Sequence, residues 1–265
     1  KNIVQKSLNK VMTTPKVFLI TATTGDAHLK LCMESVQAQT YSHGSLEHLV
    51  ICDGSNFESK VDAILNEFPN PTIKITKMVI PWNSGANRYI CHKIYASIPH
   101  LIHEPSYISF LDEDNTITPD HIESMVSTIL EKKCEWTYCL RTIMAPNGTF
   151  ICRDLCESLG KLHCTFISNN HTPDYLVDTS CYLIPVELAR KFSECWQRPA
   201  RSNPEGDRYF YECLSKYARS FECTMKFTLN YRVENRSDSV KRDFFLLGNS
   251  VMARRMNIEK LPWDV

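Results

Sequence analysis

Three consecutive carboxylates, Asp112, Glu113 and Asp114, come directly after a short apolar run. The run at 107–111 consists of residues typical of strands, so it predicts a buried strand. Because an unpaired charge is costly inside a core, the carboxylates are expected where this strand emerges. Asp112 and Asp114 are two positions apart and would point the same way in an extended segment. Two adjacent carboxylates suit Mg²⁺ or Mn²⁺, which in turn suits a phosphate.

Each acidic candidate also has a plainer interpretation. The 112–114 segment is alternatively a solvated acidic turn before a helix. Asp53 ends an apolar strand in an Asp-Gly pair, which also describes an ordinary turn. Asp207 precedes an apolar helical pattern, where a carboxylate is stabilised by capping and by the helix dipole, with or without a catalytic role. Position alone therefore leaves both interpretations open for all three sites.

Composition predicts an ordinary globular protein. The chain has 265 residues, 43% of them hydrophobic, and its 30 basic residues balance 30 acidic ones. The absence of a basic field argues against a nucleic-acid partner, and no apolar run approaches the roughly 20 residues needed to span a bilayer. The 12 cysteines are scattered and form no C-x-x-C pair. We therefore expect a reducing compartment, the cytoplasm, with the protein either free or peripheral at a membrane surface.

Strands and helices alternate four times in the first half of the chain. Each predicted strand is followed by a helical pattern, which indicates an α/β fold with a mostly parallel sheet and helices on both faces. Ligands of such sheets bind beyond the carboxyl ends of the strands. Four polar clusters fall at these ends, namely the loop after Thr21, Asp53, the loop at 83–85, and Asp112 with Asp114. Their convergence on one edge predicts a binding site there.

The second half is less regular, and we interpret the chain as a single domain, 1–265, with an embellished C-terminal half. A strand at 136–144, a hairpin turn at 146–148 and a long polar loop at 153–173 are expected first. A strand at 178–184, helices after Pro185 and from Asp207, a strand at 227–233 and a polar tail complete the prediction. Ile90 is expected to face inward from the helix that follows the 83–85 loop.

A group of metal-ligand types occurs outside these clusters. Cys152, Cys156, His163 and Cys164 lie close together in the sequence. Their spacing differs from that of standard zinc modules, so a structural metal there is only a minor alternative.

The segment from Asp112 to Thr116 also matches the Asp-x-Asp-x-Thr string of the haloacid dehalogenase-like phosphatases. The first aspartate would then be a nucleophile. In that family the motif normally closes the first core strand, whereas here it closes the fourth. Phosphatase chemistry using Asp112 and Asp114 remains an alternative.

The chain resembles the family 2 glycosyltransferases of the GT-A fold over nearly its whole length. The resemblance is carried by an ordered set of segments rather than by any one motif. They are Val-Phe-Leu-Ile-Thr at 17–21, Glu-Ser-Val-Gln-Ala-Gln-Thr-Tyr at 34–41, His-Leu-Val-Ile-Cys-Asp-Gly at 48–54, Asn-Ser-Gly-Ala-Asn at 83–87, the DxD motif at 112–114, and Gly-Asp-Arg at 206–208.

The resemblance implies a role for each matching residue. Asp207 would be the catalytic base, although Gly206 interrupts the usual Glu-Asp dipeptide and leaves Glu205 as a rival. Asp112 and Asp114 would hold the metal, Mn²⁺ or Mg²⁺. The implied donor-binding residues are Thr21, Asp53, His92, Lys93, Asp112 and Asp114.

The resemblance also implies the activity and its partners. Residues 15–130 would form a nucleotide-sugar-binding half, and 131–265 an acceptor-binding half with the tail. The expected enzyme is a metal-dependent, inverting glycosyltransferase that moves a sugar from a UDP- or GDP-sugar to a glycan, a glycolipid or another hydroxyl acceptor. A non-catalytic sugar-nucleotide-binding module is a further alternative.

Overall fold

The structure, a computed structural model, describes residues 15–86, 90–168, 173–199, 202, 205–236 and 239–256. Four parallel strands form one half of its sheet. They are β1 (Lys16–Thr23), β2 (Ser45–Asp53), β3 (Lys74–Ile80) and β4 (Tyr107–Phe110). All four run in the same direction, so their carboxyl ends share one edge, as the sequence predicts.

The remaining strands extend this sheet with mixed directions. They are β5 (Thr116–Ile117), β6 (Trp136–Met144), β7 (Phe150–Arg153), β8 (Tyr182–Pro185) and β9 (Phe221–Arg232). Among the described residues the strand order is β3-β2-β1-β4-β8-β6-β9-β5, with β7 paired to β6. β8 runs antiparallel to β4 and β6, whereas β6 and β9 are parallel.

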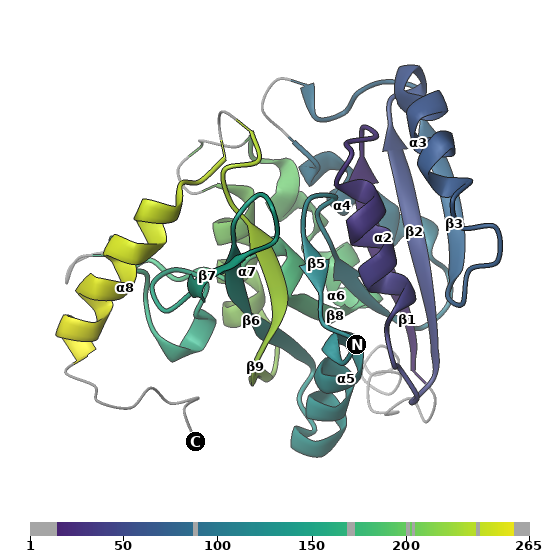
Figure 1. Cartoon of the computed structure of the whole chain (residues 1–265). Helices are drawn as coiled ribbons and strands as arrows, with labels where there is room; N and C mark the ends of the chain where they lie inside the picture. Colours follow the sequence, from purple (N-terminus) through teal and green to yellow (C-terminus); the bar gives the residue numbers. More distant parts are fainter. Residues whose placement is uncertain are drawn as a thin grey trace, which may run out of the picture.

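Helices lie on both sides of the sheet (Figure 1). They are α2 (Leu29–Gln37), α3 (Glu58–Leu65), α4 (His92–Ser97), α5 (His121–Lys132), α6 (Val186–Lys191), α7 (Gly206–Tyr217) and α8 (Arg242–Met256). Along β2, Leu49 and Ile51 join one buried cluster, while Val50 and Cys52 join a second one. Both faces of β2 are therefore covered, which confirms the predicted α/β class with helices on both faces.

Several predicted boundaries differ from the structure. Ile90 does not face inward: it precedes α4, has a φ of 49° and is 55% exposed. The predicted strand at 178–184 begins only at Tyr182, because Asp178 caps a short 3₁₀ turn by accepting from the Ser180 N–H. β9 starts six residues before its predicted start at 227.

The predicted polar tail is wrong for 242–256, which form α8. Phe245 and Met252 are buried, and Asn249 donates to the Arg153 carbonyl at 2.8 Å. Gly248 allows the close approach, since a Cβ there would lie 2.6 Å from the Cys156 sulfur. α8 and β3 lie at opposite ends of the molecule (Figure 1). Within the described ranges, none of the helices has the length and apolarity needed to cross a membrane.

Candidate active site

A cavity of about 270 Å³ opens where β1 and β4 end. Its size is close to the lower end of typical small-molecule sites. Carboxylates dominate its lining, and the histidine and arginines among its walls come from different segments. The lining residues are Ala22, Ile90, Cys91, His92, Asp112, Glu113, Asp114, Asp178, Thr179, Glu205, Asp207, Tyr231, Arg232, Arg236 and Ser239.

Asp112 is held by hydrogen bonds of its side chain and of its backbone. Its Oδ1 accepts a hydrogen bond of 2.7 Å from the Tyr95 hydroxyl, and its backbone N–H donates to the Ser180 hydroxyl at 3.1 Å. Burial raises the pKa of Asp112 to about 7, and the negative charges of Asp178 and Asp114 add to this effect. A cation beside these oxygens would relieve the same repulsion.

Glu113 points away from solvent, toward the loop after β1. Its carboxylate accepts hydrogen bonds from the Thr23 hydroxyl and from the N–H groups of Thr24 and Asp26. Arg236 completes the arrangement with an ion pair of 3.0 Å. Glu113 therefore fixes the loop that follows β1.

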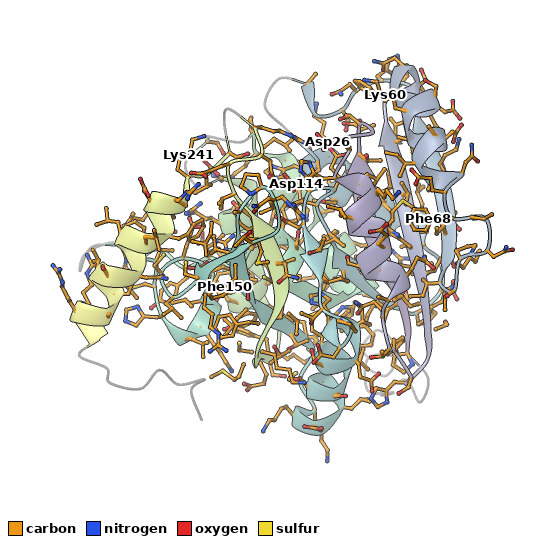
Figure 2. All side chains as sticks on the ribbon, in the orientation of Figure 1. Asp26, Lys60, Phe68, Asp114, Phe150 and Lys241 are labelled. Carbon is orange, nitrogen blue, oxygen red and sulfur yellow. The ribbon has the colours of Figure 1, made fainter. Side chains whose placement is uncertain are left out.

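Asp114 lies at the same end of the sheet as Asp26 (Figure 2). Its Oδ2 accepts a hydrogen bond of 3.3 Å from the Asn235 side-chain amide, and Arg232 donates to its carbonyl at 3.2 Å. Asp112 and Asp114 thus line one cavity, although residues 112–115 form a turn rather than the extended segment that the prediction assumed. Within the described part of the chain, no group of three or more His, Cys, Asp or Glu side chains is arranged to hold a metal ion.

Asp207 lies in the first turn of α7 and lines the same cavity. Its Oδ1 accepts from the backbone N–H of Arg208 at 2.8 Å. Burial raises the pKa of this carboxyl, and the nearby Arg208 guanidinium opposes that rise. Glu205 also lines the cavity, so the structure keeps both carboxylates near the site.

His92 packs against the start of α7. Its Nδ1 lies 3.1 Å from the Arg198 carbonyl oxygen, and its ring lies 5.4 Å from the Trp196 ring. A Cβ on Gly206 would lie 2.8 Å from the same Nδ1. Gly206 therefore stands at a position where any side chain would strike the His92 ring.

Three predicted donor-binding residues lie outside the cavity lining. Thr21 is fully buried and hydrogen-bonds His48 Nε2 at 2.9 Å. The Asp53 carboxylate accepts from the N–H groups of Ser84 and Gly85, at 2.6 and 3.0 Å. Lys93 is not among the lining residues. Asp53 therefore has a definite structural role, in holding the 83–85 loop against the end of β2.

The cysteine and histidine group does not form a metal site. No such cluster exists among the described residues, which include Cys152, Cys156, His163 and Cys164. The Cys156 sulfur instead lies in the core, 4.0 Å from the Phe245 carbonyl. These residues are close in the sequence, but their side chains do not converge on one point where a metal ion could bind.

Sequence reasoning missed several residues of the cavity. Cys91, Asp178 and Arg236 line it, and Tyr95 supports Asp112 from α4. The sequence pattern indicates Tyr95 as a buried helix residue and Asp178 as the first residue of a strand, and neither position signals a binding site. Arg236 follows β9 in a polar stretch and gave no signal. Only the folded arrangement identifies them.

Comparison with known proteins supports the fold. No family model matches the chain. Over 86 residues it is 34% identical to an uncharacterized protein of Haemophilus influenzae, and the match covers 32% of this chain and 52% of that protein. The chain therefore spans about half the length of this relative.

Solved structures of TarS from S. aureus share the architecture. TarS 1-349 in complex with UDP-GlcNAc matches with a TM-score of 0.62 at 14% identity, covering 94% of this chain and 68% of that one. Its complex with UDP gives 0.61 at 13% identity over 94% and 67%. TarS 1-349 alone gives 0.58 at 15% identity over 82% and 60%. At these identities the likeness establishes the fold alone, which is of the GT-A type found in glycosyltransferases.

Proposed function

We propose that the chain is a metal-dependent, inverting glycosyltransferase that uses a nucleotide-sugar donor, related to family 2. One observation carries the proposal. The fold brings Asp112 and Asp114 together with Asp207, which is far from them in the sequence, at the walls of one cavity at the carboxyl edge of the sheet. Ligands of open α/β sheets bind at this edge.

The carboxylates fit a hard divalent cation. Mg²⁺ is usually held by one or two protein carboxylates together with substrate phosphates and water, so a pair of aspartates is sufficient. Asp112 and Asp114 would hold the cation, and hydrogen bonds from Tyr95 and Asn235 fix their side chains. When bound, Mn²⁺ or Mg²⁺ would neutralise the charge that develops on a diphosphate leaving group.

Asp207 is the base in this proposal. With Oδ1 committed to the Arg208 N–H, its Oδ2 is the atom we assign to take the proton from an acceptor hydroxyl. Burial raises its pKa, which increases its affinity for that proton. The acceptor oxygen would attack the anomeric carbon from the face opposite the diphosphate, which inverts the configuration.

The proposed donor is a UDP- or GDP-sugar, and the acceptor a glycan or glycolipid. The TarS structures of similar fold contain UDP-GlcNAc or UDP, which supports trying uridine nucleotides first.

Donor contacts from Asp53, Lys93 and the loop after Thr21 remain predictions, and so do the division at 130 and a cytoplasmic location. His92 lines the cavity beside the start of α7, so we move its proposed role toward the acceptor side.

The phosphatase alternative loses support from the fold. Asp112 follows the fourth strand of a GT-A-type sheet and accepts from the Tyr95 hydroxyl, whereas a nucleophilic aspartate would close the first core strand. A non-catalytic sugar-nucleotide-binding module would have the same cavity as an enzyme, so the cavity does not distinguish these two functions. Donor turnover separates the two.

The test combines binding with turnover. A thermal-shift panel of UDP- and GDP-sugars, with and without Mn²⁺, should identify a donor that stabilises the protein only with the metal. Slow hydrolysis of that donor should follow and should disappear in Asp207→Asn, which retains nucleotide binding. Release of phosphate from simple phosphoesters without a nucleotide sugar would refute the proposal.

A further inference from the structure

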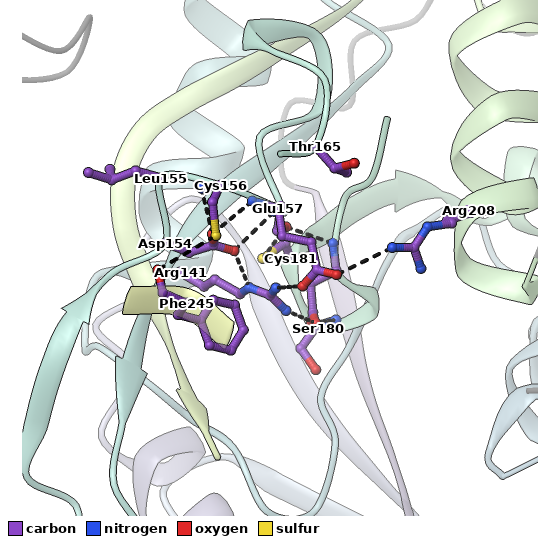
Figure 3. Close-up of polar contacts among 12 residues, drawn as sticks. Arg141, Asp154, Leu155, Cys156, Glu157, Thr165, Ser180, Cys181, Arg208 and Phe245 are labelled. Carbon is purple, nitrogen blue, oxygen red and sulfur yellow. Dashed lines mark hydrogen bonds and ion pairs between the residues drawn. The ribbon is translucent and has the colours of Figure 1, made fainter. Parts of the chain in front are cut away.

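A buried ion cluster lies beside the cavity. Arg141 on β6 has a side chain that is only 2% exposed and is surrounded by three carboxylates. Its Nε contacts Asp154 at 2.7 Å, and its two terminal nitrogens contact Asp178 and Glu157 at 2.5 Å each. Figure 3 shows this guanidinium between the carboxylates and shows Arg208 directed toward Glu157.

The cluster is rigidly built. Asp154 is fully buried, and its two oxygens accept backbone N–H groups from three successive residues, 156–158, at 2.9 to 3.0 Å. Glu157 is anchored to Arg141 by one oxygen, so its other oxygen has a fixed position. One guanidinium faces three carboxylates, which leaves negative charge for a second cation to compensate.

Arg208 is that second cation. Its Nη2 contacts Glu157 at 3.3 Å, and its Nε donates to Asp174 at 3.1 Å. The same residue carries the backbone N–H that binds Asp207 Oδ1. The guanidinium that meets the ion cluster is therefore one residue from the proposed base.

Among the described residues, charged groups act on Asp207 from more than one element. Arg208 favours the ionised carboxylate, and so does His92 when protonated, whereas Glu205 on the same turn disfavours it. Burial raises the pKa of Tyr182 on β8, and the charges of Tyr211 and Asp207 add to this rise. Arg208 is the permanent positive charge in this set.

We propose that Arg208 is the positioning residue of Asp207, held in place by Glu157 and Asp174 as an extension of the Arg141 cluster. Its guanidinium keeps the Asp207 carboxylate ionised, and its N–H fixes Oδ1 so that Oδ2 is left for an acceptor hydroxyl. The role in transfer rests on the function proposed above. The electrostatic arrangement exists without substrate and can be tested separately.

The first test is a ¹³C NMR titration of the Asp207 carboxyl in the unliganded protein, with Asp207→Asn used to assign its resonance. In Arg208→Gln we expect the Asp207 pKa to rise by about one unit, because a cation that favours the ionised carboxylate has been removed. Arg208→Lys should restore most of the shift, because it keeps the charge. Lys226→Gln, which removes a cation from an exposed pair with Asp120, should leave it unchanged.

The second test measures donor hydrolysis against pH. Arg208→Gln should move the acid limb of kcat/KM upward with the NMR value. Arg208→Lys should lower kcat/KM at every pH without moving the limb, because one ammonium cannot span Glu157 and Asp174. Glu157→Gln should behave as Arg208→Lys does, with UDP binding intact. An unchanged Asp207 pKa in folded Arg208→Gln would overturn the proposal. Absence of donor hydrolysis by the wild-type protein would instead refute the proposed function, and the NMR result would stand.

Discussion

Gly206→Ala tests how the start of α7 is positioned. The added Cβ would lie 2.8 Å from His92 Nδ1 and 2.9 Å from its Cε1, whereas carbon contacts normally lie near 3.5 to 4.0 Å. The His92 ring or the helix must therefore shift by roughly 0.7 Å. The ring cannot move freely, because it packs on Trp196 and donates from Nδ1 to the Arg198 carbonyl.

Overpacking of this kind costs about 1–3 kcal/mol of unfolding free energy, part of which is the strained hydrogen bond of His92. Urea unfolding of the wild type, Gly206→Ala, His92→Ala and the double variant forms a double-mutant cycle. Removing the ring should remove the clash, so we expect Gly206→Ala to cost less than about 0.5 kcal/mol in the His92→Ala background. Donor hydrolysis should fall in Gly206→Ala, because Asp207 is the next residue.

Additive costs in that cycle would refute this explanation of Gly206. The glycine would then be unrelated to His92, and its departure from the Glu-Asp dipeptide would need another cause. Gly148→Ala is the matched control for glycine replacement in general: nothing lies within 4 Å of its Cβ position, although its φ of 82° adds backbone strain. Its cost should not change when His92 is replaced.

Three further predictions concern stability and turnover. Burial lowers the pKa of His48 to about 3, so below about pH 6.5 the unfolded chain binds a proton that the folded chain does not. The free energy of unfolding should therefore fall by about 2 kcal/mol from pH 6.5 to 5. Urea unfolding of His48→Gln should show a correspondingly smaller loss over the same range. Arg141→Met should cost about 3–5 kcal/mol in urea unfolding, because it leaves three buried carboxylates without their cation, whereas the exposed Lys226→Gln should cost less than about 1 kcal/mol. Asp207→Asn should reduce donor hydrolysis by at least about a hundredfold with unchanged UDP affinity in calorimetry, since general-base catalysis contributes that much.

The parallel half of the sheet was predictable because its signals are local. Apolar runs mark β1 to β4, helical spacing marks α2, and the carboxylates of 112–114 follow a strand that must end before them. The parallel arrangement then places these ends at one edge. Asp207 was predicted as a site residue only from the resemblance to a known family, because a carboxylate at the start of a helix is common without any function.

The remaining features depend on contacts between distant segments. Arg141 lies in the middle of a correctly predicted strand, but its partners come from an irregular loop and a short turn. The direction of Glu113 is set by the N–H groups of another loop. α8 was missed because few apolar residues mark its buried side, and Gly248 in its middle lowers its helical signal.

The β9 boundary has a similar explanation. Met225 has a φ of 60°, and the pairing of β9 with β6 shifts register between Tyr138 and Arg141. A bulge of this kind interrupts the alternation of buried and exposed residues, so the sequence pattern shows only the part of the strand after it.

The central claim is that Asp112 and Asp114 bind a divalent cation that carries the nucleotide diphosphate. Calorimetry of UDP binding, with and without Mn²⁺, tests it in the wild type, in Asp114→Ala and in Asp62→Ala, which removes an exposed carboxylate paired with Lys77. The account predicts that Mn²⁺ strengthens UDP binding at least about tenfold in the wild type and in Asp62→Ala, and has no effect in Asp114→Ala. Equal strengthening by Mn²⁺ in Asp114→Ala would contradict it.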